Sequence, residues 1–390
     1  MSTASISAPL RRATAPLQTK WGQRGLAAAI IVFAVIMPFF FDSGSDFISD
    51  CSYALAYVVM ALGLNVVVGF AGLLDLGYVA FYAFGSYAVG WFASSQFFHA
   101  DVHILVGTFA KSQPGIHLNF LLIIVAAAFI AGLFGAILGF PTLRLRGDYI
   151  AIVTLAFGEI IYRVAVNGDQ GVFGIGKFNL TNGKRGINPL DKPQLPFMSN
   201  PFTDFDLRPW YYLALALALL GTFICLRLRD SRLGRSWIAV REDEVAAVSM
   251  GIPTVKVKLL AYAIGAAFGG VAGAYLGALI GGVNADSFQF AFSIFVLSMI
   301  ILGGIGSIWG VIVGALALSF INTTLIPDVF NNVPSKLGLD FDLTQLGYAI
   351  FGFLLVIMMV LRPQGLIPER RREIELTEGL SDEPLVEVRA

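Results

Sequence analysis

The chain has 390 residues, of which 57% are hydrophobic and only 13% are charged, and its mean hydropathy is +0.76. A soluble protein of this length could not bury so much apolar surface, so the composition excludes the soluble classes and predicts a membrane protein. The formal net charge is zero, which gives no basis for binding to nucleic acid. Several apolar runs are long enough to cross about 30 Å of hydrocarbon as helices. We therefore expect an all-α, polytopic membrane protein with about ten transmembrane helices, some of them broken or rich in glycine.

Ten apolar segments are the candidates for these helices. They cover residues 25–41, 52–70, 74–94, 119–140, 148–166, 210–226, 257–282, 288–302, 308–321 and 345–361. The first segment follows a basic stretch, as in a secretory signal, but no small-residue cleavage pattern comes after it. We therefore expect it to be an uncleaved helix.

The distribution of Lys and Arg predicts the orientation of the chain. Ten crossings put both termini on one side of the membrane, and 18 Lys and Arg residues fall in the segments of that side, against seven on the other. The positive-inside rule makes the richer side cytoplasmic. We expect a cytoplasmic tail over 1–24, a transmembrane domain over 25–362 with a cytoplasmic loop at 227–256, and a second cytoplasmic tail over 363–390.

Polar residues in or beside the apolar runs are the candidates for a substrate pathway, because such side chains are costly in hydrocarbon. The six candidates are Asn65, Asp75, Tyr78, Tyr82, Thr154 and Glu159. Two of them have a competing interpretation. Asp75 lies within the glycine-rich break GFAGLLDLG (69–77) and could cap a cytoplasmic turn instead. Glu159 stands four residues before Arg163, so the two could form a self-neutralising ion pair near the headgroups.

The apolar run 257–282 carries a glycine at every fourth position. These residues are Gly265, Gly269, Gly273, Gly277 and Gly281. Spacing of four places them on one face of a helix. A face of bare backbone lets another membrane helix approach closely. We therefore predict a packing surface, either within the bundle or against a partner subunit.

The loop 227–256 contains an amphipathic segment. On a helix over about 234–250, an apolar face is formed by Trp237, Val240, Val245 and Val248. Such a face predicts docking into a groove on another protein, and a helix lying in the lipid interface is the alternative. Three consecutive acidic residues in this segment favour docking. The residues predicted to make this contact are Arg235, Trp237, Arg241, Glu242, Asp243 and Glu244. On the helix, Arg241 and Glu244 are one turn apart and could pair with each other.

Three patterns suggest other chemistry, but each lacks an essential part. The segment GVFGIGKF (171–178) resembles a phosphate-binding loop, but Phe178 stands where a Ser or Thr would bind magnesium. His99 and His103 are four apart, but their surroundings have no helical pattern. The sequence contains no HExxH or GxSxG motif. We predict no catalytic residue, no metal site and no cofactor on this chain.

Five segments, in order, resemble the LivM-type permease of branched-chain amino acid ABC importers. They are GLNVVVGFAGLLDLGYVAFYAFGSYAVG (63–90), LRGDYIAIVTLAFGEII (145–161), GRSWIAVREDEVAAVSMGI (234–252), KLLAYAIGAAFGGVAGA (258–274) and SMIILGGIGSIWGVIVGA (298–315). The similarity runs through most of 52–362. It implies a permease domain in the bacterial cytoplasmic (inner) membrane that translocates branched-chain or other hydrophobic amino acids.

The resemblance also implies partners. These are a second LivH/LivM-type permease subunit, two ATPase subunits that would hold the ATP, and an extracytoplasmic substrate-binding protein. It implies further that the helix at 234–250 contacts an ATPase.

Two alternatives stay open from the sequence. A permease of an importer for urea or short amides would share the architecture, and Lys184 and Arg185 make the outer segment LTNGKRGI (180–187) more charged than the family pattern. An ion-coupled secondary transporter would carry its own coupling charges, which Asp75 and Glu159 could supply, and would need no docking helix.

Overall fold

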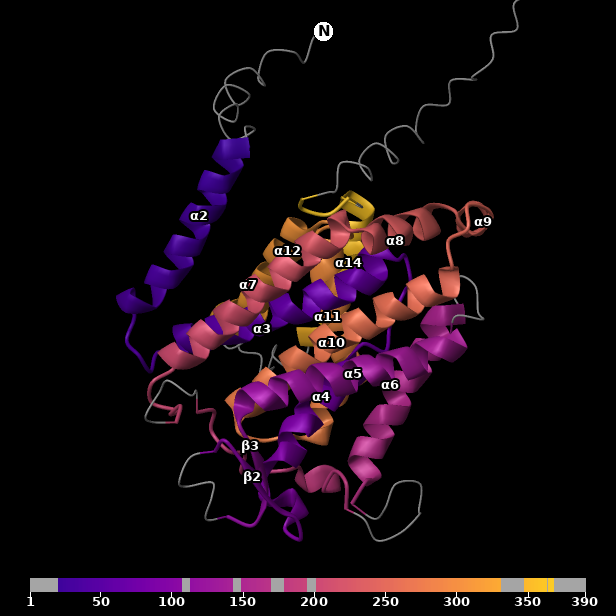
Figure 1. Ribbon diagram of the computed structural model, residues 1–390. Helices are drawn as coiled ribbons and strands as arrows, with labels where there is room; N and C mark the ends of the chain where they lie inside the picture. Colours follow the sequence, from indigo (N-terminus) through magenta and orange to yellow (C-terminus); the bar gives the residue numbers. More distant parts are fainter. Residues whose placement is uncertain are drawn as a thin grey trace, which may run out of the picture.

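The computed structural model describes residues 20–106, 113–142, 149–169, 179–194, 201–330, 347–362 and 364–367. These residues form a bundle of helices with a small sheet at one end (Figure 1). Most of the two predicted tails and the segment 171–178 lie outside the described residues.

In the described part of the chain, ten apolar helices are present, one overlapping each predicted segment. They are α2 (Lys20–Ile36), α3 (Asp46–Asn65), α4 (Val79–Phe92), α5 (Phe120–Thr142), α6 (Tyr149–Asn167), α7 (Arg208–Asp230), α10 (Thr254–Ile280), α11 (Phe290–Gly303), α12 (Ile308–Phe320) and α14 (Gly347–Leu361). Six of the helices in the described part of the chain are long and apolar enough to span a membrane, and four more are apolar but shorter. A polytopic helical membrane protein is confirmed, whereas the number of ten crossings stays a prediction.

The break between the second and third segments lies where the glycines predict it, but its boundaries differ. α3 begins six residues before the predicted start and runs into a π-helical turn, Val66–Phe70. α4 begins only at Val79. The residues between are not helical because the Asp75 carboxylate accepts the Gly77 N–H at 2.9 Å, a local bond that competes with a helical turn.

α10 lies at the centre of the bundle, against α3, α4 and α5 (Figure 1). A Cβ atom on Gly273 would overlap the Tyr82 carbonyl oxygen of α4, so the two backbones come as close as glycine allows. Ser86 of α4 donates a hydrogen bond to the Gly273 carbonyl at 3.0 Å. A Cβ atom on Gly265 would likewise overlap the Gly63 carbonyl of α3, whereas one on Gly269 would meet only the side chains of Tyr78 and Phe81. Gly281 is different from the prediction, because it ends α10 with a left-handed φ of 76° rather than packing on its face.

The predicted polar loop after α4 contains a three-stranded sheet. Its strands are β1 (Ala93–Ser94), β2 (Asp101–Ile104) and β3 (Gly115–Leu118), in the order β1-β3-β2. His103 pairs with His117 across the parallel β2–β3 register, and their rings stack 5.2 Å apart. His117 Nδ1 contacts the Asp191 carboxylate at 2.5 Å, which joins the sheet to the segment 179–194.

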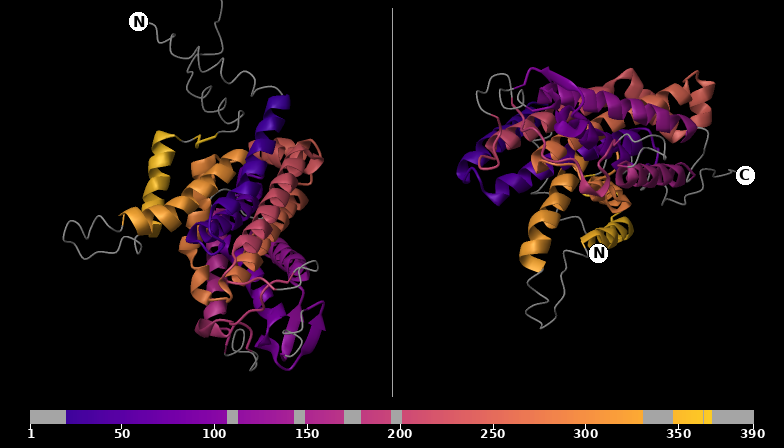
Figure 2. Two further views of the ribbon diagram at one scale, coloured as in Figure 1. Left: turned by 90° about the vertical axis from the view of Figure 1, so that its left-hand side faces the viewer. Right: turned by 90° about the horizontal axis from the view of Figure 1, so that it is seen from below.

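The sheet lies at the opposite end of the bundle from α8 (Arg232–Glu242) and α9 (Glu244–Ser249), which connect α7 to α10 (Figures 1 and 2). α2 stands apart from the other helices (Figure 1). It meets α7 through the hydroxyl groups of Tyr211 and Tyr212, which donate to the carbonyls of Ala34 and Val35 at 2.8 and 3.0 Å.

Candidate functional site

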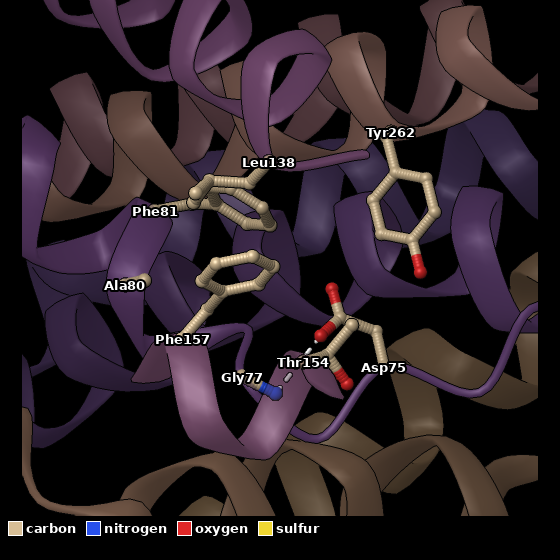
Figure 3. A pocket seen from close by; sticks show the side chains of 8 residues that line it. All are labelled: Asp75, Gly77, Ala80, Phe81, Leu138, Thr154, Phe157 and Tyr262. Atoms are coloured by element: carbon tan, nitrogen blue, oxygen red, sulfur yellow. Dashed lines mark hydrogen bonds between the residues drawn. The ribbon is translucent and has the colours of Figure 1, made fainter. Parts of the chain in front are cut away.

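A small cavity lies where the connection between α3 and α4 meets α4, α5, α6 and α10 (Figure 3). Its volume is about 10 Å³, which is about the space that one water molecule occupies. It is lined by Asp75, Gly77, Ala80, Phe81, Leu138, Thr154, Phe157 and Tyr262. Among these, Asp75 is the one ionisable carboxyl group.

Asp75 is only 2% exposed, and it belongs to the connection rather than to either helix. Its Oδ1 accepts the Gly77 N–H, as the turn-capping interpretation predicts. Its Oδ2 and the Tyr262 hydroxyl are both buried without a hydrogen-bond partner among the described residues. Burial raises the pKa of Asp75 to about 6, although the Gly77 hydrogen bond lowers it. Tyr262 was not among the residues predicted from the sequence. The feature that could have identified it is a polar phenol group within an apolar run.

Four other pathway candidates are buried between helices and contact neighbouring elements there. Asn65 Oδ1 accepts the Gly306 N–H at 2.9 Å, and the Tyr78 hydroxyl donates to the Gly265 carbonyl at 2.8 Å. Thr154 Oγ1 accepts the Leu76 N–H at 3.0 Å. Tyr82 packs against the rings of Phe288 and Phe292, at 5.3 and 5.0 Å. These contacts join elements of the bundle to one another, and a role in the pathway stays a prediction for all four.

Glu159, the sixth candidate, forms the predicted ion pair with Arg163 on α6, with Nε and Oε1 2.9 Å apart. Glu159 does not lie near an end of the helix, whereas Arg163 is one turn before the last residue, Asn167. Glu159 is ten residues after Tyr149 and eight before Asn167. At 1.5 Å per residue it is about 15 Å and about 12 Å from these ends, close to the middle of the span. Its side chain is 42% exposed and that of Arg163 is 69% exposed.

The predicted docking helix at 234–250 is two helices. Asp243 has an extended backbone, and its carboxylate accepts the N–H groups of Val245 and Ala246 at 2.8 and 3.0 Å. It therefore caps the start of α9 and ends α8. Trp237 is fully buried, and its Nε1 donates to the Val257 carbonyl of α10 at 2.7 Å. The prediction that Trp237 and Val240 face a partner is wrong, because this chain covers both of them.

The charged residues of this region attach α8 and α9 to the bundle. Arg241 donates to the Gly69 carbonyl at the end of α3, at 2.6 Å. Glu244 pairs with Lys258 of α10 at 2.7 Å, and this Lys side chain is 8% exposed. Arg241 and Glu244 therefore do not pair with each other, which was one of two alternatives for them, since each has a partner in the bundle. The role of Lys258 was not predicted from the sequence, because a lysine that flanks an apolar run is common and indicates no particular partner.

An exposed apolar surface remains on α9. It consists of Val245, Val248 and Met250, which are 73%, 54% and 83% exposed. We call these three residues the α9 surface. Glu242 and Asp243 are exposed beside it, and Arg235 is exposed on α8, where it donates to the Asp230 carbonyl at 2.9 Å. Of the predicted contact residues, the acidic ones therefore lie near this surface.

A family described as the permease component of branched-chain amino acid transport systems matches residues 50–359. The high-affinity branched-chain amino acid transport system permease proteins LivM of Salmonella typhimurium and Escherichia coli are each 36% identical over 376 residues, covering 92% of this chain and 78% of theirs. The permease protein LivH of Salmonella typhimurium is 26% identical over 82% of this chain and 92% of its own length. No solved structure matches the chain.

Proposed function

The chain belongs to the family of permease components of branched-chain amino acid transport systems, and on that premise we propose that it is one membrane-spanning subunit of an ATP-driven importer for branched-chain amino acids. The observation that carries this function is the 36% identity to the LivM proteins over 92% of the chain. That similarity extends over the apolar helices and over the α8–α9 connection between them. The membrane in question is the bacterial cytoplasmic membrane, with both termini in the cytoplasm.

The proposed importer contains a second permease subunit, two ATPase subunits and an extracytoplasmic binding protein. The ATP belongs to the ATPase subunits. In this chain the one segment that resembles a phosphate-binding loop, 171–178, lacks the Ser or Thr that would hold magnesium. The similarity to both LivM and LivH proteins supports the pairing of two related permease subunits.

We assign the ATPase contact to the α9 surface rather than to Trp237. Three exposed apolar side chains on a short polar connection are a surface that a partner's groove can cover. The connection is also held rigidly, because Glu244 is paired with Lys258 of α10 and Arg241 is bonded to the end of α3. A displacement of α9 would therefore move the central helices of the bundle, as coupling to ATP hydrolysis requires.

The test is reconstitution. The chain, produced with its partner permease, ATPase and binding protein, should copurify with the ATPase and should take up leucine into proteoliposomes only with ATP. Uptake driven by an ion gradient without the ATPase would instead support a secondary transporter. ATP-driven uptake of urea or a short amide, with none of leucine, would support the amide importer.

A further inference from the structure

The Glu159–Arg163 pair lies at an unusual place for two charges. α6 is a candidate membrane span, with Glu159 near its middle and Arg163 one turn closer to its C-terminal end, and both side chains are exposed in part. An ionisable residue at this depth is costly in lipid, and such residues face a bundle interior or a water-filled passage. Only 28% of the most apolar part of α6 is buried by the rest of the described structure. Much of α6 is therefore left uncovered by the described structure, and it is the charged pair, rather than the low burial, that favours a neighbour other than lipid.

The ion pair leaves bonding capacity on both partners. Arg163 uses Nε, and Glu159 uses Oε1. In the described part of the chain, the terminal guanidinium nitrogens of Arg163 and the Oε2 of Glu159 have no hydrogen bond. A guanidinium group has five N–H donors and can hold a carboxylate with two parallel bonds, and a carboxylate can accept further donors. The pair therefore offers a donor edge and an acceptor side by side.

We infer that this pair binds the charged backbone of the transported amino acid as it crosses the membrane, an inference that rests on the proposed function. The terminal nitrogens of Arg163 donate hydrogen bonds to the α-carboxylate, and Glu159 Oε2 accepts a hydrogen bond from the α-ammonium group. The Nε–Oε1 bond stays in place, so binding does not leave a charge without a partner. A zwitterion and an ion pair are both neutral overall. Their contact inside the membrane therefore has a lower desolvation free energy than the contact of groups with a net charge.

The neighbouring exposed residues fit the rest of such a substrate. Ile160 is 46% exposed and follows Glu159 directly, and Ala156 is exposed one turn before it. Both lie on the accessible side of α6 and are apolar. They provide a surface on which an aliphatic side chain can lie. A solvated i, i+4 pair also contributes little to stability by itself.

The decisive variant is the double substitution Glu159→Gln/Arg163→Gln in the full importer complex. Gln at both positions removes both charges but keeps similar length and hydrogen-bonding groups. If the pair is only structural, each single Gln variant is impaired because one charge is left alone, and the double variant recovers. If the pair binds the zwitterion, the double variant assembles normally and hydrolyses ATP, but its leucine uptake falls by about tenfold or more.

A matched control is the pair Lys192–Asp204, which lies outside the helices with its charged atoms 2.5 Å apart. The double variant Lys192→Gln/Asp204→Asn should leave uptake near the wild-type rate. Wild-type uptake of the Glu159→Gln/Arg163→Gln variant would overturn the inference while leaving the proposed function intact. If the wild-type complex itself does not transport amino acids, the proposed function fails instead.

A second measurement tests the surroundings of the pair. Ile160→Cys, in a background with Cys51 and Cys225 replaced by Ser, should react with a charged, water-soluble thiol reagent, and leucine supplied with the binding protein and ATP should slow the reaction. No reaction with the charged reagent would overturn the inference. A disulfide or crosslink from this position to the second permease subunit, in place of labelling, would show that the face is a subunit interface and would also overturn it.

Discussion

α10 and α6 are both long apolar helices, but they treat their polar groups in opposite ways. In α10 the backbone carbonyls of Gly265 and Gly273 accept hydrogen bonds from Tyr78 and Ser86 of α4, and 67% of its most apolar part is buried. In α6 the corresponding share is 28%, and its charged pair is exposed. The comparison teaches that the buried polar groups of α10 join helices to one another, whereas the charged pair of α6 is left exposed by this chain and is the place where we propose that the substrate binds.

The strongest way to break this comparison is to push α10 away from α4. In Gly273→Leu the new side chain would meet the Tyr82 carbonyl and the Ser86 backbone, which cannot move aside as a flexible side chain could. We expect loss of assembled protein, measured by size-exclusion chromatography in detergent. Gly352→Leu on α14 is the control, since no heavy atom lies within 4 Å of its added Cβ. Normal assembly of Gly273→Leu would show that α10 does not depend on this close approach.

Trp237 resembles the buried groups of α10, because it is a buried side chain that joins two helices, α8 and the start of α10. Trp237→Ala removes a fully buried side chain and its hydrogen bond to Val257. Replacing a core Trp by Ala costs about 3–5 kcal/mol, so we expect a lower thermal midpoint and less folded protein. If the variant keeps wild-type stability and loses only the ATPase, Trp237 would be a docking residue after all.

The α9 surface should behave in the opposite manner. Val245→Asp and Val248→Asp place charges on exposed positions, so the fold and membrane insertion should be preserved. Association with the ATPase should weaken by about tenfold or more, because buried apolar contacts dominate such interfaces. The measurement is ATPase binding to purified permease. Asp230→Asn, an exposed change away from this surface, is the control, and equal ATPase binding by all variants would contradict the assignment.

The smallest expected effect is a change of stability with pH that is due to Asp75. The cavity of Asp75 is lined by residues of both α6 and α10. The pKa of Asp75 is raised to about 6 in the folded protein from an ordinary value of 3.8. Between these values the folded state holds a proton that the unfolded state has released, so stability falls as pH rises from about 4 to about 6. We expect a higher thermal midpoint at pH 5 than at pH 7.5.

Asp75→Asn isolates this effect from other titrating groups. The variant should lose part of the pH dependence and should be more stable than the wild type at pH 7.5, where the buried carboxylate is charged. An identical pH profile for variant and wild type would show that Asp75 does not titrate in this range.

Apolar periodicity predicted the positions of the helices well, because a run of apolar residues flanked by polar ones can adopt few other structures in lipid. It did not predict the sheet after α4. The strands there have two to four residues, and they are held by pairings distant in sequence, such as His117 with Asp191. A local sequence pattern cannot predict such contacts.

The site residues were predictable by type but not by surroundings. The amphipathic pattern of 234–250 located an apolar face, but a pattern cannot distinguish a face covered by the same chain from one left for a partner. Trp237 belongs to the first kind, and Val248 to the second. The turn-capping interpretation of Asp75 predicted its bond to Gly77. The position of Tyr262 in the same cavity could not be predicted, because it is set by how α10 packs on the rest of the bundle.

The π-helical turn Val66–Phe70 makes this region sensitive to chain length. A π turn holds one residue more than a regular turn and is equivalent to a one-residue insertion in a continuous helix. Deleting one of its residues would let the regular pattern continue and would rotate everything after it by about 100° around the helix axis. Gly72, which lies against the Arg241 side chain, would turn away from it, and Asp75 would leave its cavity. The spacing of this stretch therefore matters as much as its composition, since an in-frame loss of one apolar residue would misalign the contact with α8 and the cavity together.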